Sequence, residues 1–202
     1  MGPLVAGLIV IGVLAILALN FQPSRDSSVK PPTSVVKPDD PTPPPIGPNA
    51  KENPIGDPVV KNHIQVSAVW LAGVTMEGMS MPPDVIHLEA DVKATEGNPN
   101  GFAKDEFVPY MKVGYSIVDA STGATVDSGA MSPMIASDGL HYGASVAMPK
   151  PGHYKLVYQL QPPSAGGLGR HVGLGGVAAW WAPFTAEFDW PVEKTTALAG
   201  AR

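Results

Sequence analysis

The sequence predicts an all-β fold, an antiparallel β-sandwich that follows an apolar N-terminal segment and a proline-rich stretch. From about Val59 to Glu193, apolar and polar residues alternate with a period of two instead of 3.6, which is typical of strands with one buried face. The chain of 202 residues contains 22 glycines and 23 prolines, and only 15% of its residues are charged. This composition favours turns over helices, and no long amphipathic helical pattern is evident in the sequence.

Seven alternating runs are expected to form the strands. They cover residues 63–71, 85–94, 110–118, 124–131, 142–148, 154–160 and 184–190. Turn-forming segments such as DASTGA and PKPGH separate them. Seven short strands at this spacing indicate a sandwich of immunoglobulin-like type, which we place at residues 59–194, with a short tail at 195–202.

The segment from Pro3 to Leu19 is apolar and uncharged, and it predicts a single transmembrane helix within residues 1–21. At ~1.5 Å per residue the segment would span roughly 25 Å, which is sufficient for one crossing. A cleaved signal peptide is the alternative, but no Lys or Arg precedes the run and no small-x-small site follows it. Arg25, Lys30 and Lys37 lie after the span, where the positive-inside rule favours the cytoplasm.

Residues 22–58 predict a proline-rich linker, with the sequence PPTSVVKPDDPTPPPIGPN at its centre. Such a segment cannot bury apolar surface and favours an extended polyproline conformation. It would serve either as a spacer or as a strap along a partner protein, because a preformed extended segment loses little entropy on docking.

Composition excludes several classes of function. A net charge of -5 and a pI near 5.4 argue against nucleic-acid binding, which needs a basic surface. The chain has no cysteine, which excludes disulfides, thiolate zinc sites and cysteine nucleophiles. The sequence contains neither a G-x-S-x-G motif nor a zincin-type histidine pair, so hydrolase chemistry is not expected.

The run VIHLEADVK places two candidate metal ligands, His87 and Glu89, on one strand face, together with Asp91, which would support them without binding the metal directly. Ile86, Leu88, Ala90 and Val92 would face one side, and the opposite side would carry the polar residues His87, Glu89 and Asp91. A solvated polar face is the alternative interpretation. A row of His, Glu and Asp without Lys or Thr favours a metal site.

The segment SPMIASDGLHYG contributes a second set of candidates. Pro133 and Gly139 predict a rigid turn here, with Met134 and His141 on either side of Asp138. An exposed thioether is a soft ligand that favours copper, although Met134 could also fill the core. Asp138 could orient a ligand histidine by a hydrogen bond without binding the metal itself, or it could simply form the turn.

His171 lies in the glycine-rich stretch PPSAGGLGRHVGLGGVAAWWAPF. Such a loop is costly to order, and Trp180 and Trp181 could anchor it by packing on the sandwich. His171 would then close a metal site, the alternative being an exposed histidine in a flexible loop. We interpret the remaining histidines, His63 and His153, as ordinary surface residues.

Several stretches of the domain together resemble a known family. HLEADVKATEGNPNGFA, PYMKVGYSI, SPMIASDGLHYG, RH and GVAAWWAPF are similar to the periplasmic iron-uptake proteins associated with high-affinity ferrous iron (Fe2+/Pb2+) permeases. The resemblance implies an immunoglobulin-like, usually dimeric domain whose copper site is formed by His87, Met134, His141 and His171. It also implies that Glu89 binds the copper or an adjacent iron or manganese ion, with Asp138 close by.

This chain departs from that family in two respects. It keeps a predicted membrane anchor and a long linker where the family usually has a cleaved signal peptide, and the run VGLGGV after His171 replaces a more polar one. We therefore expect a single-pass protein of the inner (cytoplasmic) membrane with its domain in the periplasm. It would bind copper and iron and support iron uptake through a membrane permease.

Two other functions share these features. Copper held by imidazoles and a thioether could support an enzymatic iron redox activity, as a ferroxidase or ferric reductase. Alternatively, the chain could be a single-span accessory subunit of a larger membrane complex for transport or electron transfer, with a retained or vestigial metal site.

Overall fold

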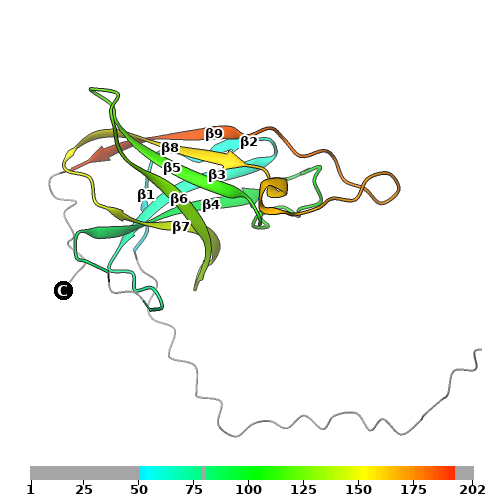
Figure 1. Cartoon of the computed structure of the whole chain (residues 1–202), viewed down its shortest axis with the longest axis horizontal. Helices are drawn as coiled ribbons and strands as arrows, with labels where there is room; N and C mark the ends of the chain where they lie inside the picture. Colours follow the sequence, from blue (N-terminus) through cyan, green and yellow to red (C-terminus); the bar gives the residue numbers. More distant parts are fainter. Residues whose placement is uncertain (1–50, 79–80, 194–202) are drawn as a thin grey trace, which may run out of the picture. The chain divides into compact units, whose positions relative to one another are not determined.

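The computed structural model describes residues 51–78 and 81–193, and it confirms the prediction of an antiparallel all-β fold (Figure 1). The strands are β1 (Asn53–Pro54), β2 (Val59–Lys61), β3 (Ile64–Ala72), β4 (Val85–Ala94), β5 (Lys112–Asp119), β6 (Thr125–Ala136), β7 (Gly139–Ala147), β8 (Gly152–Gln161) and β9 (Phe184–Val192). A 3-10 turn, η1 (Pro163–Gly166), precedes β9. The predicted anchor, most of the linker and the tail lie outside the described residues.

None of the helical structure within the described ranges has the length and hydropathy of a membrane span.

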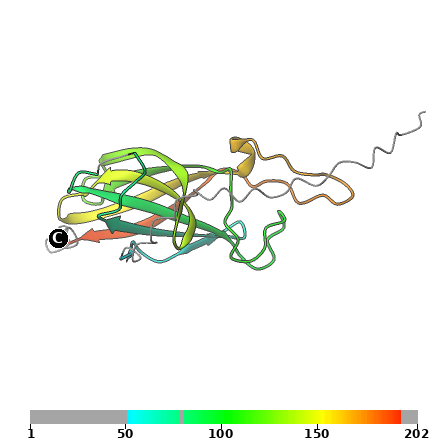
Figure 2. The ribbon, with the colours of Figure 1, turned by 90° about the horizontal axis from the view of Figure 1, so that it is seen from below.

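The strands form two layers that share β6 (Figure 2). The first half of β6 pairs with β5, where Met131 is opposite Val113, and its second half pairs with β7, where Met134 is opposite His141. The complete pairing order is β1-β3-β4-β7-β6-β5-β8-β9, with β2 also on β3. One long strand therefore turns the corner from one layer to the other, as in a half-barrel.

The pairing order also resembles that of the immunoglobulin sandwich. Strands β3-β4-β7-β6 follow the order of the four-stranded A-B-E-D sheet, and β5-β8-β9 follow that of the C-F-G sheet. In this structure, β6 continues into both layers.

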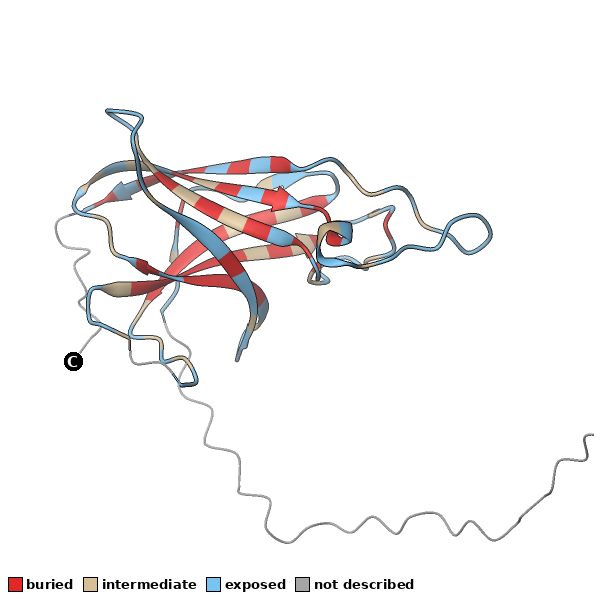
Figure 3. Cartoon of the chain, in the orientation of Figure 1, coloured by how far each residue is buried: buried red, intermediate tan, exposed pale blue. Residues whose placement is uncertain are grey.

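Alternating side chains fill the space between the layers, as the red and blue bands along the strands show (Figure 3). Ile86, Leu88 and Val92 on β4 are fully buried, as the period-two pattern predicts. Each such side chain contributes roughly 1.5–3 kcal/mol on burial. The buried Tyr142 hydroxyl donates to the Val108 carbonyl at 2.9 Å and accepts from a backbone amide at 2.9 Å, so this polar group in the core is satisfied.

The sandwich includes residues before Val59, although the linker was predicted to extend to Pro58. Ile55 is 1% exposed and β1 pairs with β3. Gly56 lies against β9, because a β-carbon placed there would be 3.3 Å from the Asp189 backbone nitrogen. This segment therefore contacts β3 in one layer and β9 in the other.

The turn predicted around Met134 and His141 is instead a β-hairpin. Pro133 and Met134 lie in β6, His141 lies in β7, and the turn proper is only Ser137 and Asp138. In this half of β6 the only described partner strand is β7. Proline is tolerated at such an edge because its missing N–H is not needed for pairing. Gly139, with φ of 129°, adopts the left-handed backbone that ends the turn.

Candidate metal centre

Two adjacent strands bring three ligand atoms together. His87 and Glu89 project from β4, and His141 projects from the neighbouring β7. The Nε2 atoms of His87 and His141 are 3.3 Å apart, and Glu89 Oε1 lies 3.3 Å from the first and 3.4 Å from the second. All three residues are at most 3% exposed, so the solvated polar face considered for His87 and Glu89 is not what the structure has.

The size of this cluster suits a metal ion. A point equidistant from the three atoms lies about 1.9 Å from each, which is 3.3 Å divided by √3. Transition-metal ions lie about 2.0–2.2 Å from imidazole nitrogen and carboxylate oxygen. His87, Glu89 and His141 would therefore be able to hold one such ion together.

Burial keeps the metal-free site uncharged. The distances from Glu89 to the two imidazoles are within ion-pair range, but desolvation opposes the charged forms. Burial, with a smaller effect of His141, lowers the pKa of His87 to about 4, and burial also lowers the pKa of His141. Burial, with a smaller effect of nearby carboxylates, raises the pKa of Glu89 to about 8. At neutral pH both rings are thus neutral and Glu89 holds a proton that a cation would displace.

The hydrogen bonds around the cluster orient two of its members. The ring of His141 bonds the backbone of Gly139, which leaves its Nε2 directed at Glu89. The fully buried Tyr158 hydroxyl donates to the Glu89 carbonyl at 2.7 Å and fixes the backbone of β4 behind the site. The Nδ1 atom of His87 is buried and has no hydrogen-bond partner among the described residues.

Met134 and His87 border a small space above Gly143. A β-carbon placed at Gly143 would lie 2.7 Å from His87 Nε2 and 3.0 Å from the Met134 sulfur. Only glycine leaves this space open, since real β-carbons essentially never approach other atoms so closely. Met134 is therefore beside the cluster, half-buried, and its soft sulfur is a fourth candidate ligand of the kind copper prefers.

An acidic pocket of about 320 Å³ adjoins the cluster, because His141 belongs to the cluster and also lines the pocket. Asp91 and Asp138, the two residues predicted to support the ligands, line this pocket together with Glu52. A hydrogen bond with Asp138, followed by burial, raises the pKa of Glu52, and burial raises the pKa of Asp91. Glu52 and Asp91 therefore hold their protons more tightly than usual, and the pocket offers carboxyl oxygen atoms to a cation.

His171 does not join the cluster. It is exposed in the loop between η1 and β9, and this loop projects away from the β6–β7 hairpin in both views (Figures 1 and 2). The group of metal-binding side chains found among the described residues consists of His87, Glu89 and His141. His63 and His153 are exposed, as expected of surface histidines.

Two residues of the site were not anticipated from the sequence. Glu52 lies in the segment assigned to the linker, and the only signal for it was the apolar Ile55 that follows shortly after. Gly143 has no side chain that could bind a metal, and it matters because its missing β-carbon leaves room for the His87 ring. Its position two residues after a candidate ligand was the only signal in the sequence.

A family model described as Fe2+ transport protein matches residues 49–193. The chain belongs to the Fe2+ transport protein family. The family relationship inferred from the sequence motifs is thereby confirmed.

Members and relatives of the Fe2+ transport protein family resemble the chain over most of its length. One similar structure is FetP from uropathogenic Escherichia coli strain F11, which was expressed recombinantly in the periplasm. FetP is 41% identical to this chain, and the two structures superpose with a TM-score of 0.65. The match covers 71% of this chain and 97% of FetP. A copper-bound FetP variant has also been solved. Copper-reconstituted P19 from Campylobacter jejuni is 37% identical to this chain, with a TM-score of 0.65. The match covers 70% of this chain and 96% of P19. A UPF0423 protein of Brucella abortus is 43% identical over 151 residues, which are 71% of this chain and 82% of the relative.

Proposed function

We propose that this chain is a copper-binding protein of the periplasm that supports iron uptake through a membrane permease. The observation that carries the proposal is the convergence of three buried ligand atoms, from His87, Glu89 and His141, at separations of 3.3–3.4 Å. The Met134 sulfur beside them favours copper over harder metals. Membership of the Fe2+ transport protein family, and the copper in the FetP and P19 structures, support the same assignment.

Substitution of His141 tests the copper site directly. We expect that His141→Ala abolishes tight copper binding, because it removes one of two imidazoles from a buried donor set. Elemental analysis of protein exported to the periplasm measures the metal content. His153→Ala is the matched control, since His153 is exposed and does not belong to the cluster of His87, Glu89 and His141. Stoichiometric copper in His141→Ala would refute the site.

We propose further that His171 of a second copy completes the copper site. His171 is exposed on a loop that extends away from the hairpin of its own domain, so within one copy it is not positioned beside Met134 and His141 (Figures 1 and 2). A homodimer in which each loop reaches the other copy's hairpin would use this geometry. His171→Ala should weaken copper binding, and copper should shift the protein toward the dimer in sedimentation experiments. If the protein stayed monomeric with copper bound, and His171→Ala bound copper as tightly as the unsubstituted protein, the proposed role of His171 would be contradicted.

The acidic pocket is the proposed site for the iron that is carried. Ferrous iron and manganese accept oxygen ligands, and Glu52, Asp91 and Asp138 supply them next to His141. Copper bound nearby would supply one-electron redox chemistry, while the oxygen atoms of these carboxyl groups would hold the iron. We expect Glu52→Gln to weaken manganese binding, measured calorimetrically, and to leave copper binding intact. If Glu52→Gln weakened the binding of both metals, or of neither, the proposal of separate copper and iron sites would be contradicted.

The apolar segment at residues 1–21 and the linker that follows would keep the domain close to a permease. We propose a single-pass inner-membrane anchor for this reason. Membrane fractionation of the full chain and of a chain lacking residues 1–21 tests the proposal. Recovery of the full chain in the soluble periplasmic fraction would refute the anchor.

A further inference from the structure

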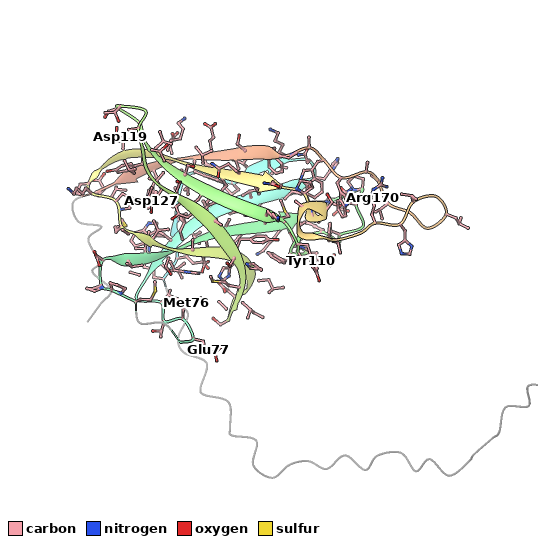
Figure 4. The ribbon with its side chains drawn as sticks, in the orientation of Figure 1. Met76, Glu77, Tyr110, Asp119, Asp127 and Arg170 are labelled. Atoms are coloured by element: carbon pink, nitrogen blue, oxygen red, sulfur yellow. The ribbon has the colours of Figure 1, made fainter. Side chains whose placement is uncertain are left out.

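The loop that carries His171 is closed on itself at its base. The Arg170 side chain donates to the Val177 carbonyl at 3.1 Å, and the Val177 amide donates to the His171 carbonyl at 3.2 Å. Figure 4 shows Arg170 at the point where this loop leaves the sandwich. The backbone of His171 is therefore bonded directly to the returning arm of the loop, and the position of that arm decides where His171 is presented.

The returning arm is held by a second segment, residues 98–102. The buried side chain of Asn100 donates to the carbonyls of Ala178 at 3.0 Å and Ala179 at 3.2 Å. The Ala178 amide in turn donates to the Pro99 carbonyl at 3.0 Å. The ring of Phe102 lies against that of Trp180, with centroids 6.3 Å apart. One amide side chain thus uses both of its N–H groups on the residues that follow Val177.

Asn100 is itself anchored to the sandwich. Its backbone amide donates to the Asn98 side chain at 2.9 Å, and the Asn98 side chain donates to the His63 carbonyl at 3.0 Å. His63 directly precedes β3. A continuous set of hydrogen bonds therefore runs from the edge of the sandwich through Asn98 and Asn100 to the base of the His171 loop.

We propose that Asn100 is a positioning residue for His171, holding the glycine-rich loop in the conformation that presents the imidazole for copper. This inference rests on the proposed function of His171 as a ligand. Glycine loses more conformational freedom on ordering than any other residue, and this loop contains Gly173, Gly175 and Gly176. Asn100 orders the loop during folding, so that ordering does not oppose metal binding later.

The test compares the full chain with Asn100→Ala, His171→Ala and the double variant. Copper affinity is measured by competition with a chromophoric chelator, and hydrogen exchange of residues 170–179 is measured on the metal-free protein. Asn53→Ala is the matched control, because Asn53 also donates to a carbonyl, that of Trp70 at 3.1 Å, away from the loop. If Asn100→Ala does not fold, Asn100→Ser, which retains one donor, replaces it.

We expect Asn100→Ala to speed exchange in the loop and to weaken copper binding about tenfold or more, the size usual for residues that orient a metal ligand. In the His171→Ala background, Asn100→Ala should cause no further loss of copper affinity. Unchanged loop exchange with unchanged copper affinity, while His171→Ala weakens copper, would overturn the role of Asn100 alone. An equal further loss in the His171→Ala background would also overturn it. No effect of His171→Ala would remove the ligand role of His171 and this positioning role with it, whereas the site of His141 is tested separately.

Discussion

Replacing Gly143 with alanine should disrupt the metal site while leaving the fold in place. The backbone of Gly143 is not in the left-handed region, so alanine is compatible with its conformation and the effect is purely steric. The added β-carbon would lie 2.6 Å from Cε1 and 2.7 Å from Nε2 of His87. Ordinary contact begins at 3.4 Å, so the ring has to move by about 0.8 Å, the difference between 3.4 and 2.6 Å.

That displacement is large for a metal ligand. Ligand distances in a functional site stay within about 0.2 Å of their ideal values, which is several times less than the shift that Gly143→Ala imposes on His87. We therefore expect copper affinity to fall about ten- to a hundredfold. The stability of the metal-free protein should fall by about 1–3 kcal/mol, the usual cost of overpacking a buried position.

The two quantities are measured by chelator competition for copper and by urea denaturation of the metal-free protein. Gly152→Ala is the control, since it adds the same methyl group in β8, which pairs with neither β4 nor β7, and its nearest atoms, those of the Tyr154 ring, are 3.3 Å or more away. The copper electronic spectrum provides a further readout, because a displaced imidazole changes the ligand field. An unchanged affinity and spectrum in Gly143→Ala would refute the proposal that His87 binds the metal from its position against Gly143.

The other predictions concern charge and hydrogen bonding at the same site. With Glu89 buried at a pKa of about 8, the folded metal-free protein keeps a proton that the unfolded chain releases above about 4.5. Its stability in the presence of a chelator should therefore fall by roughly 1 kcal/mol between pH 7 and 9, a range in which the histidines of the unfolded chain, with ordinary pKa values of about 6.5, contribute little. Glu89→Gln should abolish this slope, and a flat profile in the unsubstituted protein would contradict it. Copper at a hundred times its Kd should raise stability by about 2.7 kcal/mol at pH 7 in urea denaturation, but not in His141→Ala. Tyr158→Phe removes the donor to the Glu89 carbonyl and should cost about 1–3 kcal/mol in the same assay, with a change in copper affinity below tenfold.

The strands were predictable because each has one face in the core. Ile86, Leu88 and Val92 alternate with polar residues, and the sequence pattern records that alternation without knowledge of the rest of the fold. The extension of β6 was not predictable in this way. Pro133 and Gly139 usually interrupt strands, and only the free edge of β6 in this region makes Pro133 acceptable.

The residue types of the candidate site were predictable from the sequence, but the distances between the residues and their burial were not. The alternation along β4 placed His87 and Glu89 on one face, but their burial depends on neighbouring strands that the local pattern does not report. Pairing of β4 with β7 then brings His141 within 3.4 Å of Glu89, across more than fifty residues of sequence. His171 remains a prediction, because its proposed contact lies with another copy of the chain.

Because β6 belongs to two layers, those layers are joined by continuous strand pairing at that edge of the sandwich. Removing the β6–β7 hairpin would require separating β6 from β5 and also β7 from β4. If the site binds an ion as proposed, we expect the ion to enter and leave without separation of these strands. A peptide copied from the β6–β7 hairpin alone would lack this brace and should not reproduce the site.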